Sequence, residues 1–265
     1  MTDAASPTPV LPGAEPQSWP GGPDGALVIH GFTGSPQSMR GLAQAFADAG
    51  FTTELPLLPG HGTSIDDMIP TTWSDWSATA EAAYQDLALR CERVVVVGLS
   101  MGGTLATWLA ANHPEIVALV AINAAVMPQP EIAELLLPLL EAGEATFDGI
   151  GNDVAKEGVV ELAYPQTPLA ALASLGAAID ELQPLLASVQ CPTLVMSSPE
   201  DHVVPPAASD LLASSVSGPV ERVTLARSYH VATIDHDADL IAREAVAFAR
   251  AACEADAAVA ADSTD

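Results

Sequence analysis

The stretch Val94 to Gly103, VVVVGLSMGG, decides the fold because a continuous apolar run meets a glycine-rich turn. Four consecutive valines bounded by glycine are typical of a strand that is covered on both faces of a sheet. The residues that follow have helical spacing, which places Ser100 on a sharp turn between a strand and a helix. Gly98 and Gly102 are the small residues that let these two elements pack closely.

Such a turn holds the Ser100 hydroxyl away from the sheet at the N-terminus of a helix. The amide of Met101 is then free to bind a developing oxyanion, which makes Ser100 a candidate nucleophile. The alternative is an ordinary strand-to-helix turn with serine as the N-cap. That alternative accounts for Ser100 but not for the residues at the other strand ends.

Two further predicted strands end at side chains suited to assist a serine nucleophile. Residues 193–197 lead to Asp201, and residues 220–225 lead to His230. Because the carboxyl ends of parallel strands meet at one edge of a sheet, Ser100, Asp201 and His230 are expected to converge. The order serine, aspartate, histidine is that of the α/β-hydrolases.

In this arrangement His230 takes the serine proton, while Asp201 fixes the imidazole tautomer and stabilises its charged form. Rival bases are His202, which is adjacent to the acid and expected to point away, and His236 at the start of the following helix. Glu200 is a minor rival to the acid.

The chain resembles the bacterial monoacylglycerol lipases, with related carboxylesterases as the next neighbours. The resemblance covers roughly residues 26–250 and rests on the motifs HGFTGSPQSM, LPLLPGHGT, DDM, TTWSDW, VVGLSMGGTLATWLA, INAAV, ELAYPQTP, EDHVVPP and SYHVATID. It implies an α/β-hydrolase fold, a mostly parallel sheet flanked by helices, with a small, mainly helical lid insertion. It also implies that the amide of Phe32 is the second oxyanion donor. The chain departs from the pattern at Pro199, where those enzymes carry an acidic residue two positions before the catalytic aspartate.

The expected organisation is a flexible proline-rich segment over 1–24, a hydrolase core over 25–124 and 186–253, a lid over 125–185 and an acidic tail over 254–265. By resemblance, Ile150, Asn152 and Glu161 belong to the part of the lid that closes the polar end of the site. Glu161 is the candidate acceptor for substrate hydroxyls. The alternative is that it is a solvated lid carboxylate.

Composition limits the partners of the chain. Thirty-four acidic residues against eight basic ones give a net charge of −26, which argues against nucleic acid and against an anionic lipid surface. No uninterrupted apolar run approaches a membrane span of roughly 18 residues, so stable membrane insertion is not expected. The N-terminus lacks the basic and apolar parts of a signal peptide, which predicts a cytoplasmic protein. The three cysteines are expected to be reduced and structural.

The sequence thus predicts a serine hydrolase that cleaves monoacylglycerols through an acyl-enzyme, without a metal or an organic cofactor. One alternative is a general carboxylesterase for short and medium acyl chains. Another, from a different class, is a ligand-binding receptor that keeps the fold but does not turn over. Neither the oligomeric state nor the acyl-chain preference is indicated by the sequence.

Overall fold

A seven-stranded sheet in the order β1-β3-β2-β4-β5-β8-β9 forms the centre of the protein. The computed structural model describes residues 8–149 and 151–262. All neighbouring strands are parallel except β1, which runs antiparallel to β3. The strands are β1 (Gln17–Trp19), β2 (Asp24–Ile29), β3 (Thr52–Leu55), β4 (Arg93–Leu99), β5 (Ala118–Ile122), β8 (Thr193–Ser197) and β9 (Val220–Thr224). The mostly parallel sheet expected from the sequence is confirmed.

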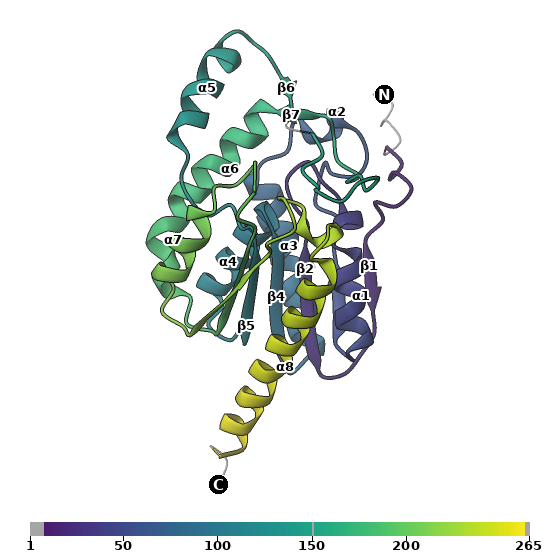
Figure 1. Ribbon diagram of the computed structural model, residues 1–265, viewed down its shortest axis with the longest axis vertical. Helices are drawn as coiled ribbons and strands as arrows, with labels where there is room; N and C mark the ends of the chain where they lie inside the picture. The colour runs from purple at the N-terminus through teal and green to yellow at the C-terminus, as the bar shows by residue number, and fades with distance from the viewer. Residues whose placement is uncertain (1–7, 150, 263–265) are drawn as a thin grey trace, which may run out of the picture.

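Helices cover both faces of the sheet, as the unbroken apolar composition of β4 requires (Figure 1). Val95 and Val97 pack with α1 and α8 on one face, whereas Val94 and Val96 pack with α3 and α4 on the other. The helices are α1 (Arg40–Asp48), α2 (Ile65–Met68), α3 (Trp73–Arg90), α4 (Met101–Asn112), α7 (Ala207–Ser215) and α8 (Ala238–Asp262), with short 3-10 turns η1 (Pro36–Ser38) and η3 (Ala232–Ile234). Every strand before one of these helices therefore ends at the same edge of the sheet.

The N-terminal end of the chain differs from the expectation. Residues 17–19 form edge strand β1, and Arg40 donates hydrogen bonds to the carbonyl oxygens of Gly13 and Glu15 at 3.0 and 3.2 Å. The described part of the N-terminal segment is thus attached to the core, and the expectation of a flexible segment is wrong for residues 8–24. Helix α8 continues to Asp262, so the acidic tail is helical over 254–262. Residues 1–7 and 263–265 lie outside the described residues.

The chain between β5 and β8 leaves the sheet and arches over its carboxyl edge, at the top of Figure 1. We call residues 125–185 the insertion. It contains α5 (Pro130–Glu141), two short antiparallel strands, β6 (Thr146–Asp148) and β7 (Gln166–Pro168), and α6 (Leu169–Leu182), followed by the 3-10 helix η2 (Gln183–Ser188). The small sheet was not expected, because its three-residue strands are too short to show alternation in the sequence.

One described segment, Leu169–Ser188, is long and apolar enough to cross a membrane by length and composition alone. Buried side chains of this segment, among them Leu175, Ile179 and Leu182, belong to the core that α3 and α4 share. Packing against these helices accounts for its apolar composition.

Candidate active site

Ser100 lies on the turn between β4 and α4, with the backbone angles φ 56° and ψ −121°. A non-glycine residue in this region is strained, and such strain persists only where surrounding structure imposes it. Here the Ser100 amide donates to the carbonyl of Ile122 at 3.0 Å, which ties the turn to the neighbouring strand β5. A Cβ on Gly98 would overlap the carbonyl of Gly102, and a Cβ on Gly102 would overlap that of Ile29. Both glycines are required by close backbone packing, as the sequence predicted.

The loop after β2 lies directly beside the serine. A Cβ built on Gly31 would be 3.4 Å from the Cβ of Ser100, an ordinary van der Waals contact, so the loop and the serine are immediate neighbours. Phe32 follows, and its ring packs edge-on against Trp76 with ring centroids 5.6 Å apart. This contact fixes the backbone of Phe32, whose amide the resemblance assigns to the oxyanion hole, near Ser100.

Two buried histidines support this loop. His30 Nδ1 donates to the carbonyl of Gly31 at 3.0 Å, and its Nε2 accepts from the amide of Leu58 at 3.2 Å. His61 Nδ1 donates to the carbonyl of Pro59 at 3.0 Å. Burial lowers the pKa of His30 to about 4 and that of His61 to about 3, so both are neutral. These contacts give both histidines a structural role beneath the loop.

The predicted acid and base meet at the carboxyl edge of the sheet. His230 Nδ1 lies 2.8 Å from Asp201 Oδ2, and the two side chains are only 8% and 2% exposed. Asp201 Oδ1 accepts from the amides of Val203 and Val204, each at 2.8 Å, which fixes the carboxylate. Glu200 is exposed, so the arrangement favours Asp201 as the acid.

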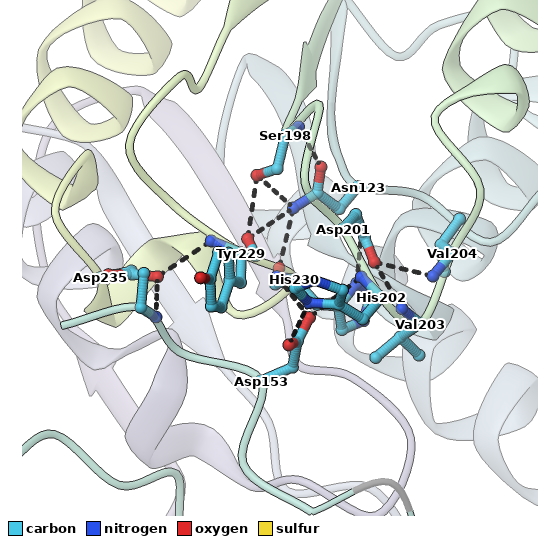
Figure 2. A network of polar contacts seen from close by, with 11 residues as sticks. Asn123, Asp153, Ser198, Asp201, His202, Val203, Val204, Tyr229, His230 and Asp235 are labelled. Atoms are coloured by element: carbon cyan, nitrogen blue, oxygen red, sulfur yellow. Dashed lines mark hydrogen bonds and ion pairs between the residues drawn. The ribbon is translucent and has the colours of Figure 1, made fainter. Parts of the chain in front are cut away.

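Asn123, which the sequence analysis did not single out, joins the two loops that carry this pair (Figure 2). Its Oδ1 accepts from the amide of Ser198 at 2.8 Å, and its Nδ2 donates to the carbonyl of His230 at 2.8 Å. The residue has a left-handed backbone, φ 42°. Asparagine tolerates this conformation better than most residues, and its position just after β5 was the available signal.

A cavity of about 530 Å³ opens at Ser100 and extends between α5 and α6. Apart from Ser100 and a few polar groups such as Gln129 and Asp180, its walls are apolar. The insertion supplies most of them, including Met127, Leu136, Leu172 and Leu175. Its size and lining suit an extended apolar group whose reactive end lies at the serine.

The predicted polar end of the site falls on residues 152–164, which we call the polar arm. Glu161 Oε1 lies so close to Gly34 that a Cβ there would be 2.7 Å away. Burial raises the pKa of Glu161, while His230 and the hydroxyl of Ser38 oppose that shift. Glu161 therefore lies beside the loop after β2 and is only partly exposed, which favours a role at the site over that of a solvated lid carboxylate.

Asn152 and Ile150 fall elsewhere. Asn152 is exposed, and its amide group spans the polar arm: Oδ1 accepts from the amide of Glu161 at 2.9 Å, and Nδ2 donates to the carbonyl of Val159 at 2.9 Å. These contacts brace the backbone that carries Glu161. Ile150 lies outside the described residues.

The polar arm is fastened to the core at several points that the sequence did not reveal. The Tyr164 amide donates to the carbonyl of Thr33 at 3.1 Å, and the Tyr164 hydroxyl donates to the carbonyl of Gly60 at 2.8 Å. On the other side, Asp153 contacts the loops that carry Asp201 and His230. The arm thus touches the loop after β2, which carries Phe32, and the loops that carry Asp201 and His230.

Residues 26–244 match the model of the alpha/beta hydrolase family. The chain belongs to this family. It is also 45% identical over 243 residues to the thermostable monoacylglycerol lipase of Bacillus sp. (strain H-257), covering 91% of this chain and 96% of that protein. A carboxylesterase of Bacillus subtilis (strain 168) is 24% identical over 237 residues, 88% of this chain and 95% of the relative. The family and the resemblance inferred from the motifs are both confirmed.

Solved structures give the same fold. One, from work on the metagenome-derived lipolytic enzymes LipS and LipT, is 45% identical with a TM-score of 0.87, covering 91% of this α/β hydrolase and 99% of that chain. The monoacylglycerol lipase of Paleococcus ferrophilus is 16% identical with a TM-score of 0.72, over 90% and 98% of the two chains. The second likeness concerns the fold alone.

Proposed function

We propose that this α/β hydrolase cleaves the ester bond of monoacylglycerols, releasing fatty acid and glycerol. The observation that carries the proposal is the position of Ser100 at the end of an apolar cavity of about 530 Å³. The buried His230–Asp201 pair, 2.8 Å apart, and the 45% identity to a monoacylglycerol lipase support it.

The proposed reaction assigns one role to each group. His230 removes the proton of the Ser100 hydroxyl as the oxygen attacks the ester carbonyl, and the amides of Phe32 and Met101 bind the resulting oxyanion. His230 then donates that proton to the departing glycerol oxygen, which leaves an acyl group on Ser100. Water, activated by the same histidine, hydrolyses this acyl-enzyme and releases the fatty acid. Asp201 holds the imidazole in the required tautomer throughout.

The substrate class follows from the two ends of the site. The apolar walls contributed by α5 and α6 take the acyl chain, and the polar arm faces the alcohol portion. Glu161, near His230 and Gly34, accepts a hydrogen bond from a glycerol hydroxyl. Further acyl chains would have to occupy the space of the polar arm, so monoacylglycerols are preferred over triacylglycerols.

The negative charge of the chain adds a second preference. A protein with a net charge of −26 gains nothing from an anionic lipid interface and meets its substrate as dispersed molecules or small micelles. Activation at interfaces is accordingly expected to be weak.

The test compares the wild type with Ser100→Ala on monoacylglycerols of increasing chain length, with short soluble esters, diacylglycerols and triacylglycerols as further substrates. Hydrolysis of monoacylglycerols that disappears in the variant supports the proposal, since the substitution removes the nucleophile and keeps the glycines of the turn. Preference for short soluble esters would identify a general carboxylesterase. Ligand binding without turnover would identify a receptor. Rapid triacylglycerol hydrolysis would contradict the claim that the polar arm leaves no room for further acyl chains.

A further inference from the structure

The insertion contributes a buried carboxylate that contacts both loops of the His230–Asp201 pair (Figure 2). Asp153 Oδ2 accepts from the amide of His230 at 3.0 Å and from the amide of His202 at 3.2 Å. Its Oδ1 lies 2.7 Å from His202 Nδ1. The Asp153 side chain is 10% exposed, so these contacts largely replace water around it.

These contacts tie together the two loops that carry the base and the acid. One contact is with the amide of His230 itself, and the other is with the amide of His202, the residue that follows Asp201. Hydrogen bonds to an ionised carboxylate are shorter and stronger than those between neutral groups. One oxygen that binds both amides fixes the distance between the two loops, and with it the 2.8 Å contact between His230 Nδ1 and Asp201 Oδ2.

We propose that Asp153 is a positioning residue for the His230–Asp201 pair. The insertion then does more than cover the site, because it supplies part of the frame that aligns the base with its acid. This proposal deepens the proposed hydrolase function and rests on it.

His202, a rival base in the sequence, belongs to the same frame. Its ring donates from Nδ1 to Asp153 and packs edge-on against Tyr229, with ring centroids 4.6 Å apart. His202 lies in the loop that carries Asp201, and from there it binds Asp153 and contacts Tyr229, the residue before His230. In this role it acts through Asp153 and takes no proton from substrate.

Asp235 provides a matched control within the same network. Its carboxylate accepts from the amides of Ala155 and Lys156 at 2.7 and 2.9 Å, and from those of Tyr229 and His236 at 3.0 and 2.7 Å. It therefore joins the same arm to the same loop. It contacts neither the amide of His230 nor the loop that carries Asp201.

The experiment compares Asp153→Asn with Asp235→Asn in the full chain. Asparagine keeps the shape of aspartate but has only one oxygen that accepts, so each variant loses part of its carboxylate's contacts. We measure kcat and KM with a monoacylglycerol, and melting temperature as a check on folding. We also record the downfield proton NMR signal of the His230 Nδ1–H···Asp201 bond in the resting enzyme, assigned by its loss in His230→Ala.

Asp153→Asn is expected to lower kcat by about 10- to 100-fold with KM within about twofold, because misplacement by a fraction of an ångström slows a step that depends on aligned groups. The downfield signal should shift or broaden in the same variant. Asp235→Asn should lower kcat by less than about threefold and leave the signal in place. A KM increase without a kcat decrease in Asp153→Asn would overturn the proposal.

Equal kcat losses in the two variants, or an unchanged signal in Asp153→Asn, would likewise overturn it and leave Asp153 only as a fastening of the arm. If Asp153→Asn does not fold, His202→Phe keeps the ring against Tyr229 and removes only the Nδ1 donor. It should change the same signal and lower kcat several-fold. No change in either quantity would refute the proposal that Asp153 and His202 position the His230–Asp201 pair. The NMR signal needs no substrate, so a wrong substrate class would leave this test intact.

Discussion

The polar arm and the two helices α5 and α6 belong to one insertion, yet they are held in different ways. The polar arm is fastened by directional hydrogen bonds, such as those of Asp153 to His230 and of Tyr164 to Thr33. The helices contribute apolar side chains to the cavity, and α5 leaves Leu135 and Leu137 more than half exposed. The polar arm hydrogen-bonds to the backbone of His230 and of the loop after β2, whereas α5 and α6 line the cavity beyond them.

This difference teaches which property each region controls. Hydrogen bonds specify atoms and angles, so the polar arm depends on the identity of its residues. Apolar burial is non-directional and depends on volume, so the helices tolerate exchanges that keep the space they enclose. We expect substitutions near the polar arm to change rate and headgroup recognition, and substitutions in the helices to change chain-length preference.

The largest effect should come from the acid of the pair that the polar arm frames. Asp201→Asn is expected to lower kcat about 10⁴-fold, because asparagine favours the wrong imidazole tautomer. The matched control is the exposed neighbour Glu200→Gln, for which kcat should stay within about threefold. Steady-state kinetics on a monoacylglycerol decide between them. Similar losses in both variants would show that the register of the acid is wrong.

The next effect concerns stability beneath the loop after β2, where His30 and His61 are buried and neutral. Burial places their folded-state pKa values at about 4 and about 3, below the ordinary 6.5. Protonation therefore favours the unfolded chain: the stability is fully present above pH 6.5 and is lost as pH falls. Between pH 7 and 5 the loss should be about 2 kcal/mol for each histidine.

Urea unfolding at several pH values measures this loss, and His61→Asn serves as the comparison because its amide can still donate to Pro59. The variant should lose about half as much stability as the wild type over the same range, or about 2 kcal/mol less. Identical slopes for both proteins would mean that His61 does not contribute. The cavity between α5 and α6 has no histidine in its wall, so substitutions there should leave the slope unchanged.

A smaller effect should follow from narrowing the apolar end at Gly176. This α6 residue lines the cavity, and a Cβ built on it meets nothing within 4 Å. Gly176→Leu should lower kcat/KM for long acyl chains about tenfold relative to short ones, since the added side chain takes the volume of several methylenes. Gly176→Ala is the control: it raises helix propensity by about 1 kcal/mol and should hardly change chain-length preference. Uniform losses across the chain series would indicate a distorted helix instead.

The smallest effect should appear at the headgroup. Glu161→Gln is expected to raise KM for monoacylglycerol by a factor that corresponds to about 0.5 to 1.5 kcal/mol of binding free energy, because a charged acceptor for a hydroxyl becomes neutral. The KM for a short ester without glycerol should rise less. If KM rises equally for both substrates, Glu161 supports the arm and does not bind the alcohol. The assignment of headgroup recognition to the polar arm then fails.

Much of the site was predictable because its signals are local. The valines of β4, the glycines around Ser100 and the order of Asp201 and His230 each occur within a few residues of a strand end. The topology of a parallel sheet then brings those ends together at one edge. Composition and periodicity thus sufficed for the fold, and the motifs for the predicted triad.

Other features left no local pattern. Strand β1 is three residues long and exists only because β3 offers it a free edge. The acidic tail continues helix α8 to Asp262, although its residues beyond Cys253 are almost all exposed. For β1 the pairing with β3 provides stability that a three-residue segment lacks alone, whereas the tail extends a helix whose core contacts are made by residues before it.

By itself the sequence determined the α/β-hydrolase sheet and the positions of Ser100, Asp201 and His230 along it, because strand periodicity and turn chemistry operate over neighbouring residues. Only the tertiary structure decided that Asp153 would lie against His230, 77 residues further along the chain. A hydrogen bond to a backbone amide does not depend on the partner's side chain, so neither residue's type indicates the other. Their meeting depends on the course of the polar arm over the folded core.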